Sequence, residues 1–190
     1  MVYEAEAEGW ITRFLAFYAG SEKIEKIGPV RSARPYFIDW AHEFSALFAH
    51  CGGSPEALVK IKKDKIFDLN EFYNEKYFWR DGARDAPHNI YTSTEKLRKY
   101  LKTKELTEGK YFSWQFKDDL NAEVRPEGSE ITINFQLADY IVKWKYNKEN
   151  NDYARYMAGE THKDAEGREI KAKNIVIEFV EAEIIDDVLR

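Results

Sequence analysis

Residues 45–56 read Ser-Ala-Leu-Phe-Ala-His-Cys-Gly-Gly-Ser-Pro-Glu, and this stretch decides the fold class. Its first half, residues 45–50, is an apolar run of strand length that a cysteine and two glycines close. In its second half, Ser54 is a typical N-cap, and Pro55 and Glu56 suit the first turn of a helix. A strand that turns directly into a helix is the repeating unit of α/β proteins.

The same alternation continues on both sides of this stretch. Upstream, residues 11–18 are apolar and aromatic and predict a buried strand, and Pro35 is expected to open a helix. Downstream, residues 66–69 resemble another short strand. Residues 92–95, Thr-Ser-Thr-Glu, have capping-box spacing and predict the start of a third helix.

The second half of the chain has a different pattern, in which β-branched and aromatic segments alternate with polar turns. The segments are residues 131–136, 140–146, 153–157 and 174–185. This spacing predicts an antiparallel sheet with a hairpin loop at residues 147–152. The predicted fold class is therefore α/β (α+β), with a mixed α/β domain over residues 1–108 and a smaller, mainly antiparallel β domain over residues 109–190. Because strand-like patterns run close to both ends, we also expect flanking segments.

Composition excludes several classes of protein. The chain has 190 residues, and its 44% hydrophobic content is typical of a folded globular protein. The longest stretch without a charged residue is 44–55, much shorter than the roughly 20 apolar residues of a membrane-spanning helix. With a single cysteine, Cys51, the chain forms no internal disulfide and offers no cysteine-based zinc site. We expect no cofactor and no metal.

Charge is distributed unevenly. Residues 1–108 carry 17 basic and 17 acidic residues, whereas residues 109–190 carry 12 basic and 17 acidic, so the net charge of -5 belongs to the second half. A protein that binds nucleic acid needs a basic face for the phosphate backbone, and none of that size is present. Nucleic acid is therefore not expected as a partner.

The first candidate cluster lies just before the helix expected at Pro35. Arg31, Ser32 and Arg34 come together there, after the Gly28-Pro29 turn. Helix N-termini favour anions, and arginine offers forked donors that match a carboxylate or a phosphate. The alternative is that both arginines make structural salt bridges or cap nearby carbonyl groups. The glycine pattern matches no phosphate-binding loop motif.

The second and third clusters are a strand end and a long loop. Gly52 and Gly53 would let backbone amides approach a ligand after the strand that ends at His50, although a plain tight turn explains them equally well. In the loop before residue 92, His88, Asn89 and Tyr91 could contact a ligand. Satisfaction of local backbone groups is the alternative explanation for such residues.

Catalytic interpretations remain open. His88 or His50 could act as a general base, with Asp39 or Asp85 as its partner and the arginines stabilising negative charge. Three histidines, at positions 50, 88 and 162, lie on separate loops without metal-site spacing, which disfavours a shared metal ion. Cys51 is a weak candidate for a nucleophile because no partner base is implied.

Residues 27–37, 50–54 and 86–93 together carry a resemblance to the YerB-like proteins of Gram-positive bacteria, which are described as putative lipoproteins with a domain of unknown function. Residues 2–17, 159–164 and 172–176 extend the resemblance over nearly the whole chain. It implies an extracytoplasmic, lipid-anchored protein with an N-terminal α/β domain and a β-rich C-terminal domain. We expect the lipid anchor itself to lie outside this chain. The family brings no established activity, so no residue role is carried over.

Three functions follow from these observations. The favoured one is a non-catalytic module that binds an anionic cell-envelope ligand through Arg31 and Arg34. In this hypothesis Ser32, Gly52, Gly53 and Asn89 donate hydrogen bonds, while exposed rings such as Trp79 and Tyr91 stack on sugars. The alternatives are a hydrolase or transferase acting on cell-wall polymers, and a scaffold whose partner is another protein that adds a strand to the acidic β domain.

Overall fold

The computed structural model describes residues 1–106, 109 and 111–181. Contacts divide the chain into two compact units, Met1 with Leu15–Trp114 and Val2–Phe14 with Gln115–Arg190. The division near residue 114 falls close to the predicted boundary at 108/109. The first residues differ, because Val2–Phe14, which form most of a hairpin of β1 (Val2–Glu6) and β2 (Thr12–Ala16), belong to the second unit.

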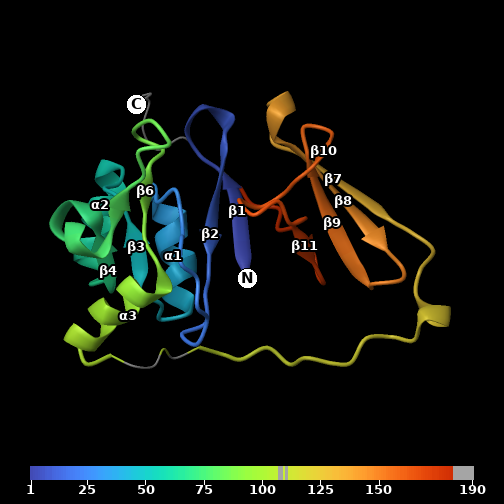
Figure 1. Cartoon of the computed structure of the whole chain (residues 1–190), viewed down its shortest axis with the longest axis horizontal. Helices are drawn as coiled ribbons and strands as arrows, with labels where there is room; N and C mark the ends of the chain where they lie inside the picture. Colours follow the sequence, from blue (N-terminus) through green and yellow to red (C-terminus); the bar gives the residue numbers. More distant parts are fainter. Residues whose placement is uncertain (107–108, 110, 182–190) are drawn as a thin grey trace. The chain divides into compact units, whose positions relative to one another are not determined.

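The first unit is built from helices and short strands in alternation (Figure 1). Helix α1 (Pro35–Glu43) and helix α2 (Pro55–Lys63) both begin at a proline, whose missing N–H has no partner to lose at that position. The Ser54 hydroxyl caps α2 by accepting from the Ala57 amide. Between the helices, β3 (Phe48–His50) pairs in parallel with β4 (Asp68–Asn70), as a strand–helix–strand unit requires.

The rest of the first unit packs around β4. Two single-turn helices, Glu71–Tyr73 and Glu75–Tyr77, lead to β5 (Trp79–Arg80), which pairs antiparallel with β6 (Ile90–Tyr91). Helix α3 (Thr94–Thr103) follows. Its N-cap is Ser93, which accepts from the Lys96 amide, so the predicted capping box at residues 92–95 is wrong by one residue. One buried hydrophobic cluster of this unit consists of Leu69, Tyr77, Phe78, Ile90 and Tyr100, and further buried residues such as Ile38 and Ala57 lie on α1 and α2.

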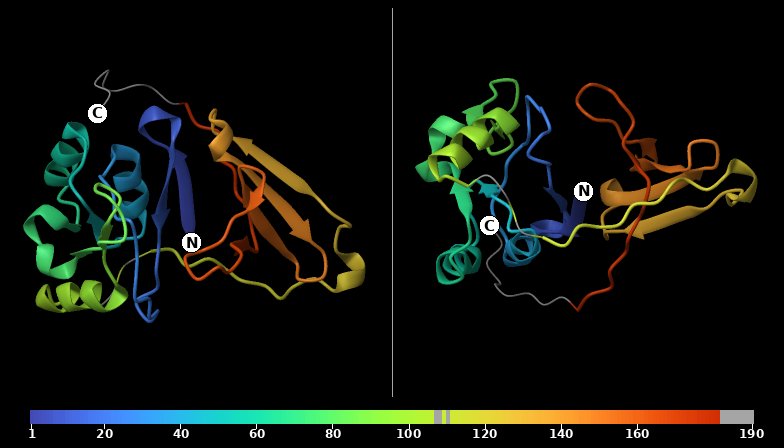
Figure 2. Two further views of the ribbon diagram at one scale, coloured as in Figure 1. Left: turned by 45° about the horizontal axis from the view of Figure 1, so that its top comes forward. Right: turned by 90° about the horizontal axis from the view of Figure 1, so that it is seen from below.

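The second unit contains an antiparallel sheet (Figure 2). Its strand order is β10-β9-β8-β7, and β11 pairs with β9 on the same side as β10. The bounds are β7 (Glu130–Asn134), β8 (Ile141–Asn147), β9 (Asp152–Met157), β10 (Glu160–Thr161) and β11 (Lys171–Ala172). Asn147 pairs with Asp152, which confirms the predicted hairpin loop. The mixed fold with a β-rich C-terminal region is thus as predicted.

One predicted strand is not found. Residues 174–181 form no strand. The rest of the predicted segment, residues 182–185, lies outside the described residues. The register supplies the reason: Ala172 pairs with Tyr153, next to the first residue of β9, so the chain beyond it runs past the end of the sheet. Phe179 is consequently 97% exposed.

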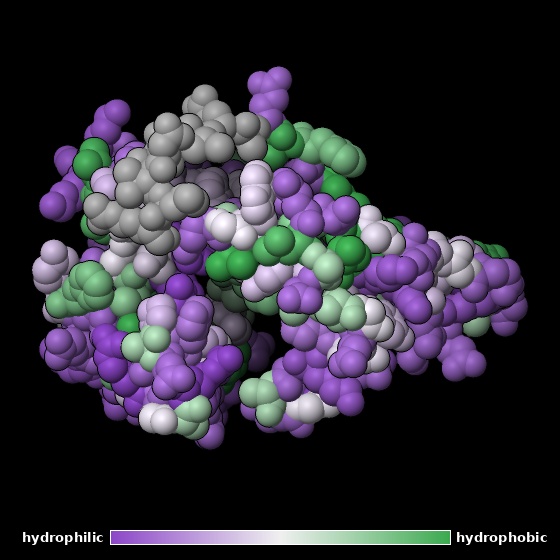
Figure 3. Space-filling model, turned by 90° about the horizontal axis from the view of Figure 1, so that it is seen from above, coloured by the Kyte–Doolittle hydropathy of each residue, from purple (hydrophilic) through white to green (hydrophobic). Residues whose placement is uncertain are grey.

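On the face shown in Figure 3, hydrophilic side chains surround smaller hydrophobic patches. The most exposed large hydrophobic residues include Phe112, Phe116 and Phe179. Within the described part of the chain, no helix is both long and apolar enough to cross a bilayer.

Candidate functional site

The three polar clusters of the first unit meet in space because residues 27–34 run between the other two. On one side, the Val30 amide donates to the Ile90 carbonyl over 2.7 Å. On the other side, the Cys51 amide donates to the Arg31 carbonyl over 3.1 Å, and the Ala33 amide donates to the Gly52 carbonyl over 3.0 Å. These long-range backbone pairs assemble the candidate site.

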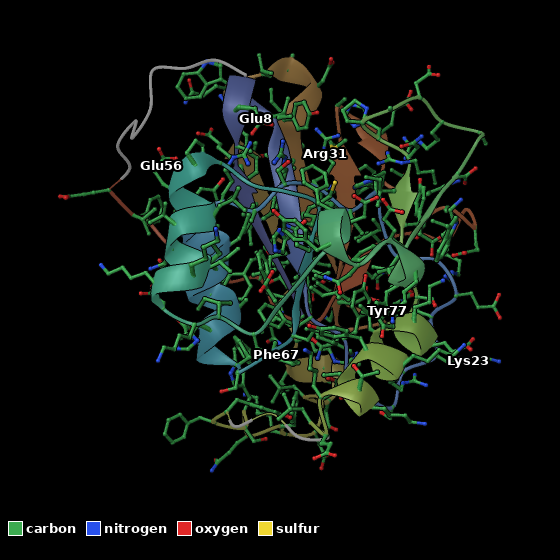
Figure 4. All side chains as sticks on the ribbon, turned by 90° about the vertical axis from the view of Figure 1, so that its left-hand side faces the viewer. Glu8, Lys23, Arg31, Glu56, Phe67 and Tyr77 are labelled. Carbon is green, nitrogen blue, oxygen red and sulfur yellow. The ribbon has the colours of Figure 1, made fainter. Side chains whose placement is uncertain are left out.

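The site lies at the carboxyl ends of β3 and β4. His50 and Asn70, the last residues of these parallel strands, are register partners. Figure 4 shows Arg31 toward the opposite end of the first unit from Phe67, which precedes β4. Loops that follow parallel strands meet at this edge, which is where ligands gather in α/β sheets.

The Arg31 guanidinium makes its hydrogen bonds to described residues through one nitrogen, Nη1. Its Nη1 donates to the Pro87 carbonyl over 2.7 Å and contacts His88 Nδ1 at 3.2 Å. Among the described residues it forms no salt bridge, and its Nε and Nη2 have no hydrogen-bond partner. Since Nδ1 of His88 accepts from a cation, the ring proton of the neutral imidazole lies on Nε2. Arg31 and His88 therefore form a connected donor pair at the surface.

A second arginine is neutralised beside it. Arg80 Nη2 donates to Glu71 Oε1, and Arg80 Nη1 donates to Asn89 Oδ1, each over 3.3 Å. The Glu71 side chain is only 9% exposed. A buried carboxylate needs such a partner, because its desolvation would otherwise be costly.

The negative charge of Glu71 affects the pKa of the neighbouring Cys51 thiol. Its Sγ lies 3.6 Å from Glu71 Oε2. Burial, followed by the negative charge and hydrogen bond of Glu71, raises the pKa of the Cys51 thiol to about 11. The thiol is therefore protonated at neutral pH, which argues against its use as a nucleophile.

His50 is occupied by the fold. It is 1% exposed, its Nδ1 lies 2.6 Å from the Gly52 carbonyl, and its Nε2 lies 3.0 Å from Asp68 Oδ2. Both ring nitrogens are engaged, so this residue has no free edge to serve as a general base.

Gly52 and Gly53 are packed against neighbouring residues of the first unit. Gly52 has φ +62°, which a glycine adopts without strain, and its amide donates to Asn70 Oδ1 over 3.1 Å. A Cβ on Gly53 would lie 3.2 Å from both Ala33 and Leu58. The Gly52 amide is thus unavailable to a ligand, contrary to the expectation.

Other predicted site residues have structural partners. Arg34 Nη1 donates to the Ala33 carbonyl over 2.8 Å, and Ser32 lies beside it in the same segment. Asp39 lies on α1, where Lys60 of α2 pairs with it at 2.8 Å, and no contact joins it to either histidine. Tyr91 is 4% exposed, so the expectation that it presents an exposed ring is wrong. The β5–β6 pairing places it against Trp79 and away from solvent.

The histidines do not share a site. His50 and His88 have the partners given above, while His162 belongs to the second unit and contacts Arg155. Among the described residues, no group of three or more His, Cys, Asp or Glu side chains is arranged to hold a metal ion.

Sequence reasoning missed Glu71, and it included Arg80 in the third cluster, residues 78–93, without giving it a role. Glu71 directly follows β4, just as Cys51 follows β3. The rule that ligands gather at strand ends was applied to β3 and would have found Glu71 if applied to β4 as well. Arg80 carries no comparable signal, because its place depends on the pairing of β5 with β6.

Comparisons with known proteins also divide the chain into two parts, but they place the β1–β2 hairpin with the first part. Residues 1–107 match the N-terminal domain of the family described as "Protein of unknown function (DUF3048)", and residues 131–190 match its C-terminal domain. The chain belongs to the DUF3048 family. A family of unknown function offers no catalytic residue with which the Arg31 site could be compared.

A DUF3048 relative from Bacillus subtilis (strain 168), named "Putative lipoprotein YerB", is 31% identical over 98% of this chain and 57% of its own length. The crystal structure of YerB protein from Bacillus subtilis superimposes with a TM-score of 0.75 at 30% identity, covering 90% of this chain and 58% of that one. The chain thus spans a little over half the length of the relative it matches.

Proposed function

We propose that the first unit is a non-catalytic binding module that takes a singly charged anionic group of a cell-envelope ligand at Arg31. The observation that carries this proposal is the free edge of the guanidinium. Nη1 is held by the Pro87 carbonyl and His88, which orients the side chain, while Nε and Nη2 present two parallel donors. Two parallel N–H groups match the two oxygens of a carboxylate or a phosphodiester.

The local charge supports a monoanion. Arg31 and Arg80 each contribute one positive charge, Glu71 contributes one negative charge, and the ring of His88 is neutral when Nδ1 accepts. One positive charge is left uncompensated, and Arg31 carries it. A singly charged ligand group balances it, whereas a second negative charge on the ligand would remain uncompensated.

The name of the relative supports a proposal for the compartment. The Bacillus subtilis protein is named a putative lipoprotein, and a lipoprotein is exposed on the outer face of the cytoplasmic membrane. We therefore propose that this chain also works outside the cytoplasm, held by a lipid anchor in the full-length protein. Cell-wall peptides with free carboxylates and phosphodiester polymers such as teichoic acid are the anions found there.

A thermal-shift titration tests the proposal. The probes are a muropeptide for the carboxylate, a teichoic-acid fragment for the phosphodiester, and inorganic phosphate and citrate as more highly charged anions. A probe at 100 times its dissociation constant stabilises by about 2.7 kcal/mol, which raises the midpoint by about 5–10 °C. We expect the carboxylate or the phosphodiester to shift the midpoint and Arg31→Ala to abolish the shift.

Lys63→Ala is the matched control, because it removes one exposed positive charge from the last turn of α2 in the same unit. Its shift should equal that of the parent chain. Equal shifts in Arg31→Ala and in the parent chain would place the anion elsewhere, and no shift with any probe would refute an anion site.

A second candidate function rests on a separate observation. Residues 111–121 have no secondary structure, and in their aromatic part Phe112 and Phe116 are 95% and 91% exposed. An extended segment with exposed aromatic rings is suited to a protein partner that adds it as a strand. Retained pull-down of one partner by the parent chain, lost on Phe112→Ser with Phe116→Ser, would favour this function.

A further inference from the structure

Phe72 is an exposed aromatic residue that the backbone fixes beside the Arg31 site. It lies on the single-turn helix Glu71–Tyr73, which directly follows β4, and 61% of the residue is exposed. Asn70, the last residue of β4, is buried, and its Oδ1 accepts from the amides of both Gly52 and Phe72 over 3.1 Å. The turn after β3 and the turn that carries Phe72 are therefore joined through one side chain.

The ring of Phe72 packs against the glycine of the turn after β3. A Cβ on Gly52 would lie 3.1 Å from Cε2 and Cζ of the ring, which is closer than ordinary van der Waals contact. A larger residue at position 52 would also be strained, because φ is +62° there. Glycine therefore lets one edge of the ring lie against the backbone, while most of Phe72 remains exposed.

Arg31 lies beside the same turn. Its carbonyl accepts from the Cys51 amide over 3.1 Å. Burial and the Glu71 carboxylate raise the pKa of the Cys51 thiol, whereas the charge of Arg31 is among those that lower it. The guanidinium is thus close enough to act on this thiol, and the residue after it, Gly52, contacts Phe72. Arg31 and the aromatic ring therefore flank the same two residues.

Asn89 supplies a hydrogen-bond donor at this site. Glu71 holds Arg80, and Arg80 in turn donates to Asn89 Oδ1 over 3.3 Å. Because Oδ1 is the acceptor in this contact, the orientation of the amide is fixed and Nδ2 is the end left for a ligand. Nδ2 has no hydrogen-bond partner among the described residues. Asn89 follows His88, which contacts Arg31, so the free amide nitrogen belongs to the same cluster.

We propose that the ligand of this site is a sugar acid whose carboxylate binds Arg31, whose hydroxyl groups accept from Asn89 and whose ring stacks on Phe72. The inference rests on the proposed function, because Arg31 supplies the charge. A pyranose combines a C–H face, which the negative face of an aromatic ring attracts, with a rim of hydroxyl groups. A nucleotide also has a flat ring, but its phosphate monoester carries nearly two charges at neutral pH, and the second would be uncompensated.

NMR titrations of the whole chain with glucuronate, acetate and glucose separate the contributions. Glucuronate has a sugar ring and a carboxylate, acetate has only the carboxylate, and glucose has only the ring. We expect glucuronate to bind the parent chain at least 10-fold more tightly than either of the others. Arg31→Ala should weaken the binding of both acids. Phe72→Ala should remove the preference for glucuronate over acetate and leave the affinity for acetate unchanged.

Three further variants act as controls. Phe112→Ala removes another phenylalanine of the first unit, 95% exposed, and should keep the preference for glucuronate. Phe72→Tyr retains the aromatic face and should also keep it. Phe72→Leu retains an apolar side chain without a flat ring and should lose it. The last two variants decide the role of the ring if Phe72→Ala fails to fold.

The outcomes distinguish this inference from the proposed function. Equal affinities of the parent chain for glucuronate and acetate, both lost in Arg31→Ala, would overturn the sugar acid and leave the anion site standing. A preference for glucuronate that persists in Phe72→Leu would overturn the role of the ring, and tighter binding of adenosine monophosphate than of glucuronate would overturn the sugar. Binding of neither acid, or binding of both that Arg31→Ala leaves unchanged, would overturn the anion site and this inference together.

Discussion

Arg31 and Arg155 make the same contact and have opposite roles in the fold. Each guanidinium uses Nη1 to contact the Nδ1 atom of a histidine. Arg155 is buried and bound by both oxygens of Glu4, whereas Arg31 lies at the surface and has no carboxylate among the described residues. The carboxylate and the burial, rather than the histidine contact, therefore decide whether an arginine stabilises the fold or remains available to a ligand.

The physical reason is desolvation. A buried guanidinium has lost its water, so every donor must find a protein partner, and the Glu4 carboxylate compensates the charge. An exposed guanidinium keeps water on its free edge, and a ligand oxygen can replace that water at little cost. Three measurements test whether burial and charge compensation separate the two arginines.

The largest effect is expected for Arg155→Met. The substitution leaves the Glu4 carboxylate largely buried without its cation, which costs about 3–5 kcal/mol of unfolding free energy. Urea unfolding measures it. Arg168→Met is the control in the same unit, since that side chain is 73% exposed and pairs with Asp164 at the surface. Equal losses for the two variants would show that burial does not set the importance of the arginine.

A smaller effect is expected for the reactivity of the Cys51 thiol, which lies beside the Glu71 carboxylate. With a pKa of about 11, the Cys51 thiol should react with iodoacetamide at pH 8 roughly 100-fold more slowly than an exposed thiol of ordinary pKa. The rate should rise with pH up to about 11. Glu71→Gln should accelerate the reaction, because the negative charge that disfavours the thiolate is gone. Glu75→Gln removes an exposed acid from the single-turn helix that follows and should not change the rate. An equal acceleration in that variant would show that Glu71 does not set the reactivity of Cys51.

The smallest effect is expected for the stability of Arg31→Ala. Surface substitutions of this kind change the unfolding free energy by about 0.5 kcal/mol or less, because water replaces the lost contacts. The same urea experiment measures it. A loss above about 2 kcal/mol would make Arg31 a structural residue like Arg155 and would remove the main argument for a binding site.

Local patterns predicted the elements of the first unit well. Pro35 and Pro55 open their helices as expected, and Ser54 caps the second one, because each signal acts within one helical turn. The 174–185 strand was predicted from β-branched content and was wrong for residues 174–181, where the register of β11 leaves no strand to pair with.

For the candidate site, the chemical groups could be predicted from the sequence: Arg31, His88 and Asn89, and the strand end at His50 beside which they lie. How these groups combine depends on the tertiary structure. Backbone pairs such as Val30 with Ile90 brought the clusters together, and they left His50 buried while His88 stayed exposed. Arg155 and Glu4, 151 residues apart, carry no local signal at all. Propensity and capping act over a few neighbouring residues, whereas burial and charge compensation depend on which distant segments the fold brings into contact.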